Sequence, residues 1–315
     1  MSVYTEVTHI DLLAFLSDYS VGKLLSYEGI SDGIENTNYF VTTEQGKFVL
    51  TLFEQHEFDE MGYFLDVMTF FFEHGIPSAH PKSDKQGRYL KKLSNKPAAL
   101  VQRLDGRGVC DVASVGQCRE IGTVLGRMHV AGLQFGRPHA TQRGAQWRQQ
   151  IAEKLLPMLD STSAKIMRDE LDFQAGYGKL NLPFGLTHSD LFRDNALFDG
   201  DKLKGIIDFY YACDEYLIYD LAVSINDWCI DETGQLETSR YQAMMAAYIQ
   251  QRSLTDAEKM HWNLVLRAAA LRFWLSRLQD KYFPREGELT QIKDPNAFLM
   301  ILRQHQELPL IVAVA

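Results

Sequence analysis

Two stretches in the first hundred residues combine β-branched, aromatic and apolar residues in the way that is typical of strands. They cover Asn36–Thr43 and Lys47–Glu54, and the tripeptide EQG (residues 44–46) joins them. A short polar connection that contains glycine is typical of a β-hairpin. The run Leu24–Ile30 just before them predicts a third strand. The pattern therefore indicates a small sheet near the beginning of the chain.

The next segment changes to a helical period. Its apolar residues are spaced as on one face of a helix, and they are Met61, Phe64, Leu65, Met68, Phe71 and Phe72. Gly75 follows as a stop signal. We expect the aromatic run Phe70–Phe72 to belong to the core. Further on, Ala98–Arg107 predicts a short apolar strand that becomes polar at Gln102, where we expect a hinge.

Helical patterns dominate after about residue 105. One helix carries an apolar face made by Val115, Cys118, Ile121, Leu125 and Met128, and others extend from Tyr219 to about Leu302. Short β-prone pieces interrupt them between residues 184 and 212. We therefore expect an α+β protein with a small sheet-plus-helix lobe over residues 1–103 and a larger, mainly helical lobe over residues 104–315. The space between two such lobes is the default position for a ligand.

Composition and charge narrow the class of protein. The chain has 315 residues and a formal net charge of −9, which argues against nucleic acid as the main partner because phosphate backbones need a clustered basic surface. The four cysteines form no C-x-x-C pair, so no zinc or thiol-redox motif is apparent. The N-terminus lacks a signal-peptide pattern, and no apolar run approaches the roughly 20 residues of a membrane span. We expect a cytoplasmic protein with no membrane partner.

The stretch THSDLFRDNALFDGDKLKGIIDFY (residues 187–210) gathers many polar side chains around two apolar pieces. The pair Asp199-Gly200 between these pieces suits a tight turn, so they predict a hairpin. A hairpin brings its ends together, so we expect Asp190 and Asn195 to converge with Asp208. Two carboxylates and an amide oxygen are hard ligands that suit Mg²⁺ bound to phosphates.

This pattern matches the catalytic loop of protein kinases, which is H-x-D-x-x-x-x-N followed by an aspartate on a later strand. Position by position, Asp190 is the expected base that orients and deprotonates a substrate hydroxyl. Asn195 and Asp208 are the expected metal ligands, and His188 is expected to brace the loop rather than carry a proton. The alternative interpretation is that these residues only cap turns, but it requires the complete set to arise by accident.

The residues after Asp208 depart from the protein-kinase pattern in one position. Phe209 keeps the expected phenylalanine, but Tyr210 replaces the usual glycine. Loss of that glycine suggests an aspartate that does not flip as it does in a protein-kinase switch.

Several longer stretches resemble the aminoglycoside-phosphotransferase-like, or choline-kinase-like, superfamily. They are HSDLFRDNALF, IIDFY, YDLA, NDWC, GIENTNYFV, FVLTLFE and RFWLSRL. Within that superfamily they resemble the homoserine kinases of this fold. The resemblance implies a protein-kinase-like two-lobed fold and ATP-dependent phosphorylation of L-homoserine to O-phospho-L-homoserine, a step of threonine biosynthesis. It also implies ATP and Mg²⁺ as cofactors, and a small-molecule substrate as the partner.

The expected nucleotide side is less regular than the catalytic loop. The segment GISDGIENTNYFVTT lies where kinases place a glycine-rich loop but lacks G-x-G-x-x-G, so the expected phosphate donors are Asn36, Thr37 and Asn38. Alignment with the kinase strand puts Thr51 where a lysine usually binds the α- and β-phosphates, which leaves the phosphate cation unassigned. We expect the base of the nucleotide to bind at Gln102–Leu104, mainly through backbone groups.

A homoserine-like substrate carries a carboxylate and an ammonium group, so its pocket needs a cation and an anion near the catalytic base Asp190. Arg193 is the candidate for the phosphoryl group or the substrate carboxylate. Asp227 and the ring face of Trp228 are candidates for the ammonium group, and Arg272 is a further candidate. The alternative for Trp228 is an ordinary core position.

Other polar residues have structural interpretations. We expect Asp220 to cap or brace the catalytic loop, His129 to be a satisfied structural histidine, and Arg277 to face water. Asp194 lies within the catalytic loop but has no assigned role.

Other functions remain open on the sequence alone. Gly29–Gly33 fits the G-x-S-x-G motif of serine hydrolases, but a β-prone run follows it where that motif needs a helix. A sibling kinase for an aminoglycoside, choline or methylthioribose would keep the same catalytic residues. Thr51 in place of lysine allows a non-catalytic nucleotide-binding module, although the intact catalytic set argues against it. The sequence predicts no oligomeric state.

Overall fold

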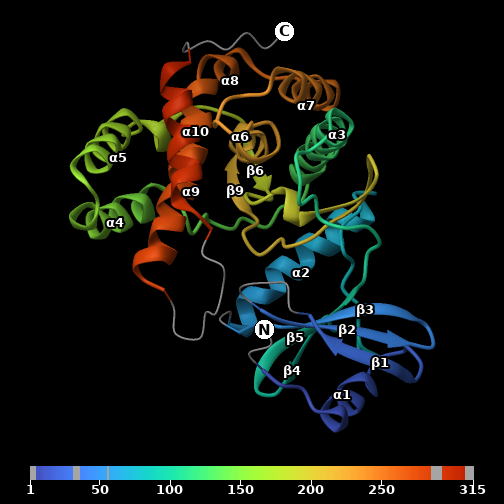
Figure 1. Cartoon of the computed structure of the whole chain (residues 1–315). Coiled ribbons are helices and arrows are strands. Elements are labelled where there is room, and N and C mark those ends of the chain that lie inside the picture. The colour runs from blue at the N-terminus through green and yellow to red at the C-terminus, as the bar shows by residue number, and fades with distance from the viewer. Residues whose placement is uncertain (1–4, 31–35, 55–56, 285–292, 309–315) are drawn as a thin grey trace. The chain divides into compact units, whose positions relative to one another are not determined.

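The computed structural model describes residues 5–30, 36–54, 57–284 and 293–308. These residues form two compact units, which Figure 1 shows as coloured ribbons. The N-terminal unit contains the described residues of 1–105 together with Gly205–Tyr210. The C-terminal unit contains the described residues of 106–204, 211–285 and 292–315. The candidate metal ligand Asp208 therefore belongs to the N-terminal unit, and Asp190 and Asn195 belong to the C-terminal unit.

The N-terminal unit is built on a five-stranded antiparallel sheet in the order β1-β2-β3-β5-β4. Its strands are β1 (Leu24–Gly29), β2 (Thr37–Thr43), β3 (Gly46–Leu52), β4 (Leu90–Leu93) and β5 (Lys96–Gln102). Thr43 pairs with Gly46, so the predicted hairpin between β2 and β3 is confirmed. The third early strand and the strand that ends at Gln102 are also confirmed.

One face of this sheet packs against α1 (His9–Leu16), a helix that the sequence analysis did not predict. Because side chains alternate along a strand, every second residue of β2 and β3 points to this face. These residues and α1 form one buried apolar cluster that includes Leu12, Phe15, Tyr39, Val41, Phe48 and Leu50. The helix has 8 residues, which are too few to show a clear helical period.

The helix α2 (Phe58–Glu73) lies on the opposite side of the sheet from α1 (Figure 1). Its predicted core positions are buried with one exception, Phe72, which is 44% exposed. Of the run Phe70–Phe72 only Phe71 is buried, so the expectation that all three belong to the core is wrong. Successive helix residues are about 100° apart, and three in a row cannot share one buried stripe. Gly75 has a φ of +72° just after the helix, as a stop signal requires.

The C-terminal unit is mainly helical, as predicted. Its helices are α3 (Val115–Gly132), α4 (Ala145–Leu155), α5 (Ser161–Phe173), α6 (Leu217–Trp228), α7 (Thr238–Gln251), α8 (Asp256–Met260), α9 (Trp262–Tyr282) and α10 (Pro295–Glu307). The short strands of this part of the chain are β6 (Phe184–Thr187), β7 (Ala196–Asp199), β8 (Lys202–Ile206) and β9 (Cys213–Tyr216). The pair of β7 with β8 confirms the second predicted hairpin, and β6 pairs with β9. The sheet in one unit and the helices in the other give the expected α+β class.

The helices α3 and α7 approach each other closely. A Cβ atom added to Gly122 of α3 would overlap the backbone oxygen of Met244 in α7, so this position needs a residue without a side chain. The predicted apolar face of α3 is buried except for Val115, which is 39% exposed because it is the first residue of the helix.

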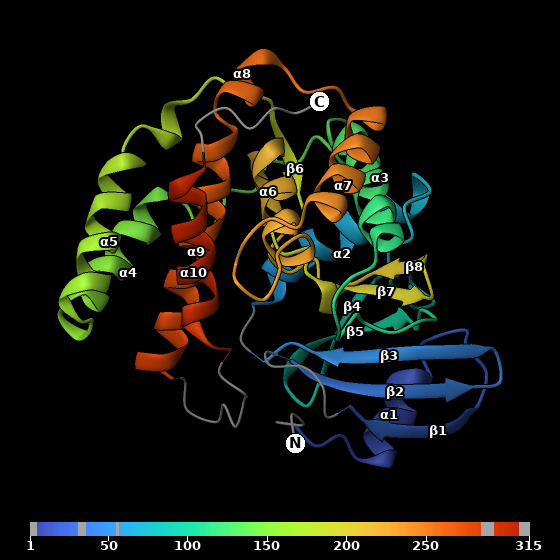
Figure 2. The same cartoon turned by 45° about the horizontal axis from the view of Figure 1, so that its top comes forward.

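The helix α6 is buried along almost its whole length. Every residue of α6 except Asp227 is buried, and Figure 2 shows the helix between α9 and α10 on one side and α3 and α7 on the other. Three of its buried residues are polar, namely Asp220, Ser224 and Asn226, and buried polar groups need hydrogen-bond partners. In the part of the chain that the structure describes, no helix is long and apolar enough to cross a membrane.

Candidate active site

The predicted catalytic loop follows β6 and is held by α6. The backbone N–H groups of His188 and Ser189 donate to the two carboxylate oxygens of Asp220, each at 2.7 Å. Ser189 has a φ of +63°, a left-handed conformation that a non-glycine residue keeps only where its surroundings impose it. Asp220 therefore fixes a strained backbone, which confirms the expectation that it braces the loop.

Asp220 keeps its negative charge although it is fully buried. Burial by itself would raise its pKa, but the hydrogen bond and charge of His129, together with the charge and backbone N–H of His188, hold the pKa below its usual value. Nε2 of His129 lies 3.1 Å from Oδ2 of Asp220. His129 is thus a satisfied buried histidine, as predicted.

Asp190, the candidate base, is oriented by three neighbours. Its Oδ1 lies 3.6 Å from Nη1 of Arg272. Nδ2 of Asn195 donates to the backbone oxygen of Asp190 at 2.8 Å and lies 3.2 Å from its Oδ2. The Asp190 N–H is directed at Nδ1 of His188 over 3.3 Å. The loop therefore presents the carboxylate in a defined direction.

Arg272 supplies a buried counter-charge to this carboxylate. Its guanidinium lies 3.7 Å from the centre of the Phe273 ring and 5.2 Å from that of Tyr211, and the residue is buried. The sequence interpretation assigned Arg272 to the substrate. The structure places it against Asp190, where it is fixed before any substrate arrives.

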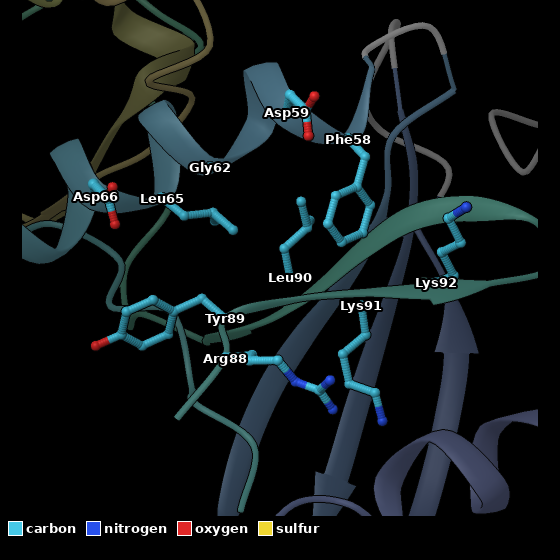
Figure 3. A pocket seen from close by; sticks show the side chains of 10 residues that line it. All are labelled: Phe58, Asp59, Gly62, Leu65, Asp66, Arg88, Tyr89, Leu90, Lys91 and Lys92. Atoms are coloured by element: carbon cyan, nitrogen blue, oxygen red, sulfur yellow. The ribbon is translucent and has the colours of Figure 1, made fainter. Parts of the chain in front are cut away.

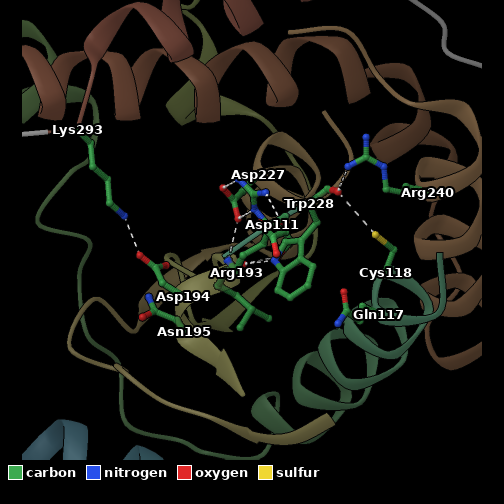
Figure 4. Close-up of polar contacts among 12 residues, drawn as sticks. Asp111, Gln117, Cys118, Arg193, Asp194, Asn195, Asp227, Trp228, Arg240 and Lys293 are labelled. Atoms are coloured by element: carbon green, nitrogen blue, oxygen red, sulfur yellow. Dashed lines mark hydrogen bonds and ion pairs between the residues drawn. The ribbon is translucent and has the colours of Figure 1, made fainter. Parts of the chain in front are cut away.

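Arg193 and Asp227, which the sequence interpretation treated as separate substrate contacts, bind each other (Figure 4). The backbone N–H of Arg193 donates to Oδ2 of Asp227 at 2.7 Å, and its Nε donates to the same oxygen at 3.2 Å. Nη1 of Arg193 also donates to the backbone oxygen of Asp111 at 2.9 Å. A substrate charge would therefore meet an ion pair at this position rather than two isolated ions.

Trp228 requires a correction. The residue is fully buried, and its Nε1 donates to the backbone oxygen of Leu191 at 3.0 Å. A ring with no exposed surface offers no face to an ammonium group in this conformation. Trp228 instead supports the catalytic loop from α6, which agrees with the core alternative.

Asp194 of the catalytic loop and Arg277 of α9 have partners that the sequence did not indicate. Asp194 binds Lys293, whose Nζ lies 2.7 Å from Oδ2. Arg277 was expected to face water, but its Nη1 donates to the backbone oxygen of Asp294 at 3.1 Å and its guanidinium lies 4.4 Å from the centre of the Phe298 ring. Burial lowers the pKa of Arg277, against the effect of nearby carboxylates that include Asp227 and Asp190.

Asp208, the second predicted metal ligand, lies in a strained turn of the N-terminal unit. It has a φ of +63°, which costs conformational energy in a residue other than glycine. The following Phe209 is fully buried, with its ring centre 5.6 Å from that of Phe71. Tyr210 packs edge-on against Phe53 and Phe64. These two aromatic residues hold the segment against α2 and against Phe53, the residue that follows β3.

The predicted phosphate-binding residues form a hydrogen-bonded group of their own around the start of β2. Thr51 donates to Oδ1 of Asn38 at 2.7 Å, and Nδ2 of Asn38 donates to the backbone oxygen of Asn36 at 3.3 Å. Thr37 is fully buried and donates to Glu54 at 2.6 Å, so its hydroxyl points into the protein and not toward a ligand. The remainder of the expected phosphate loop, residues 31–35, lies outside the described residues.

The expected hinge is partly engaged within the N-terminal unit. The N–H of Gln102 donates to the backbone oxygen of His80 at 2.9 Å, and the N–H of Arg103 donates to that of Lys47 at 3.1 Å. These two N–H groups are therefore already occupied. A nucleotide base bound at the hinge would use other backbone groups, and those of Leu104 are the next along the chain.

A cavity of about 600 Å³ lies in the N-terminal unit between α2 and β4 (Figure 3). Phe58, Leu65 and Leu90 line its apolar part, and Arg88 and Lys91 lie at its edge. These two cations already form ion pairs with Asp84 and Asp18, respectively. The predicted site residues do not line this cavity, so we do not assign it to the catalytic site.

Fold and catalytic loop together define a class of protein. A sheet-based N-terminal unit, a helical C-terminal unit and an H-x-D-x-x-x-x-N loop with a following aspartate are the parts of a kinase-like phosphotransferase.

Solved structures support this class at the level of the fold. An amicoumacin kinase in complex with AMP-PNP, Ca²⁺ and Ami gives a TM-score of 0.71 at 15% identity, and the match covers 95% of this chain and 92% of that one. A spectinomycin phosphotransferase bound to ADP and spectinomycin gives a TM-score of 0.67 at 13% identity, covering 98% and 97%.

Sequence comparison identifies the family. The model of the phosphotransferase enzyme family matches residues 26–261, and the protein belongs to this family. Curated relatives match over nearly their whole length. The chain is 48% identical to a homoserine kinase of Methylobacillus flagellatus, with 96% of this chain and 95% of the relative covered. It is 43% identical to a homoserine kinase of Methylobacillus glycogenes with the same coverage.

Proposed function

We propose that this protein transfers the γ-phosphoryl group of ATP to the hydroxyl of L-homoserine and so forms O-phospho-L-homoserine for threonine biosynthesis. The observation that carries the proposal is the 48% identity to a homoserine kinase across 96% of the chain. The intact loop residues Asp190 and Asn195, and Asp208 after the hairpin, agree with catalysis rather than with a non-catalytic binding module.

In the proposed reaction Asp190 orients the hydroxyl and accepts its proton as the oxygen attacks the γ-phosphorus. The P–O bond to ADP breaks as the new P–O bond forms. Arg272 and Asn195, which contact Asp190, hold the carboxylate in place, and His188 braces the loop. Catalysis then comes from positioning and charge neutralisation.

Mg²⁺ fits the residues available for it. The N–H₂ group of Asn195 is directed at Asp190, so its Oδ1, a hard oxygen donor, is the part of the side chain that can bind a cation. Asp208 offers a carboxylate held by a strained backbone. We propose these two residues as the ligands. When bound, Mg²⁺ would neutralise charge on the phosphate oxygens.

Nucleotide binding and substrate binding are assigned to different parts of the chain. We propose that residues 1–103 bind the nucleotide, with Asn36, Asn38 and Thr51 near the phosphates and Gln102–Leu104 near the base. We propose that residues 104–315 bind the substrate and carry the catalytic loop. The Arg193–Asp227 pair is the candidate contact for the amino-acid part of homoserine, because it presents both signs of charge next to the loop.

A coupled ADP-release assay with a panel of acceptors tests the proposal. L-homoserine should be phosphorylated at least a hundredfold more efficiently, in kcat/KM, than choline, ethanolamine, methylthioribose or an aminoglycoside. Preference for another acceptor would make the protein a sibling kinase. Absence of turnover with every acceptor would support a binding module instead.

A further inference from the structure

Three helices of the C-terminal unit share a line of buried polar side chains that ends at the catalytic loop. The helices α3, α6 and α7 lie side by side (Figures 1 and 2) and contribute His129, Asp220 and Tyr248, respectively. All three side chains are fully buried. The Tyr248 hydroxyl lies 2.7 Å from Nδ1 of His129, and Nε2 of His129 lies 3.1 Å from Oδ2 of Asp220. Asp220 in turn holds the backbone of His188 and Ser189.

The hydrogen bonds at the two ends of this line have defined donors. An ionised carboxylate only accepts, so Nε2 of His129 must donate to Asp220. The Tyr248 oxygen lies 2.7 Å from Nδ1 of His129 and accepts from Nη1 of Arg252 at 3.0 Å. Burial raises the pKa of Tyr248, so its hydroxyl keeps its proton. Consecutive hydrogen bonds of this kind polarise one another and strengthen the line.

The outer end of the line is fixed at the start of α8. Nη2 of Arg252 donates to Glu258 at 2.6 Å, and Glu258 is fully buried. The other oxygen of Glu258 accepts the Thr255 N–H at 2.8 Å, as part of the capping box that begins the helix. Arg252 therefore has a fixed position from which to hold the Tyr248 hydroxyl.

We propose that Tyr248 and Arg252 are positioning residues for phosphoryl transfer, which act through His129 and Asp220 on the loop that carries Asp190. The inference rests on the proposed kinase function and adds to it two residues outside the catalytic-loop motif. The fully buried Tyr248 cannot touch a substrate. Its loss should therefore lower kcat and leave the KM values for homoserine and ATP unchanged, because it disturbs the geometry of the base and not the binding contacts.

The test compares two tyrosines of the same helix. Tyr248→Phe removes the hydroxyl from the line. Tyr241→Phe removes another buried hydroxyl, which accepts from Trp262 at 2.9 Å and is not part of the line. Both variants should lose similar thermal stability. We expect Tyr248→Phe to lower kcat about tenfold, the effect of one lost hydrogen bond in a buried network, and Tyr241→Phe to keep kcat within twofold of the wild type.

A second variant pair protects the test against misfolding. Arg252→Lys keeps the charge beside Glu258 but loses the two separate guanidinium nitrogens that bind the Tyr248 hydroxyl and the carboxylate, so kcat should again fall with KM unchanged. In a His129→Leu background, which lacks the ring nitrogen that contacts the Tyr248 hydroxyl, Tyr248→Phe should cause no further loss of kcat. Additive losses there would contradict the proposal.

Two further results would also overturn the inference: a wild-type kcat in both Tyr248→Phe and Arg252→Lys, or equal losses of kcat in Tyr248→Phe and Tyr241→Phe. The proposed function is tested separately by the turnover of the wild-type protein. If the wild type prefers another acceptor, the same kcat ratios measured with that acceptor still test the positioning role.

Discussion

Asp190 shows how a single carboxylate depends on the residues around it. Arg272 lies beside its carboxylate, Asn195 binds its backbone oxygen, and the preceding backbone is fixed by Asp220. Such contacts set the direction of the carboxylate before a substrate binds. The loop is therefore pre-organised for one reacting position.

The first residue-scale prediction concerns the base. Asp190→Asn keeps the size of the side chain but removes its ability to accept the hydroxyl proton, so kcat should fall by roughly 10²–10⁴-fold. Titration calorimetry should show ATP binding within about twofold of the wild type. A kcat close to that of the wild type would rule out Asp190 as the base.

The second concerns the metal. Asp208→Asn replaces a carboxylate by a neutral amide at a proposed Mg²⁺ ligand. The Mg²⁺ concentration that gives half-maximal turnover should rise at least tenfold, because hard cations bind charged oxygen donors more tightly. The matched control is Asp199→Asn at the exposed end of β7 in the β7–β8 hairpin. An unchanged Mg²⁺ requirement in Asp208→Asn would refute the ligand role.

The third concerns pH and a buried histidine of α10. Burial lowers the pKa of His305 from 6.5 to about 3, and the charge of Arg267 acts in the same direction. The unfolded chain therefore binds a proton below about pH 6.5 that the folded protein does not bind, so stability falls as the pH falls from there toward 3. His305→Gln removes this proton uptake.

Urea unfolding of the two proteins at several values between pH 7 and pH 5 measures the effect. The free energy of unfolding should fall less steeply with acidity in the variant, by up to about 1.4 kcal/mol per pH unit. Parallel curves for the two proteins would show that His305 does not titrate in this way.

At the scale of elements, the contact of α3 with α7 fixes two helices that carry the polar line to the loop. Gly122→Ala would push a methyl group against the Met244 backbone, and overpacking of this kind typically costs 1–3 kcal/mol. We expect urea unfolding to show a loss of about 2 kcal/mol. Gly62→Ala in α2 is the control, since a Cβ there meets no atom within 4 Å, and it should gain about 0.5–1 kcal/mol. Equal stability of the Gly122 variant and the wild type would contradict the close packing.

The elements that the sequence predicted are those with a strong local signal. The β2–β3 and β7–β8 hairpins have strand patterns on both sides of a turn, and the catalytic loop has fixed spacing within eight residues. The helix α1 was missed because two turns give too little periodicity. Phe72 and Val115 were placed in the core because pattern alone does not show where the buried stripe ends.

At the scale of the whole molecule, most of the contacts that support the loop join residues far apart in the chain. His129 and Tyr248 are separated by 119 positions, Asp194 and Lys293 by 99, and Arg193 and Asp227 by 34. Sequence reasoning could name the charged residues near the motif. It could not pair them, because pairing depends on which helices pack together.

The central claim is a chemical one, and ³¹P NMR of the reaction tests it directly. A mixture of the protein, ATP, MgCl₂ and L-homoserine should develop one new phosphomonoester signal, split by the two protons on the carbon that carries the former hydroxyl, in equal amount to the ADP formed. The Asp190→Asn variant should produce almost none of it. Release of inorganic phosphate without this ester, or no consumption of ATP by the wild-type protein, would contradict the proposed function.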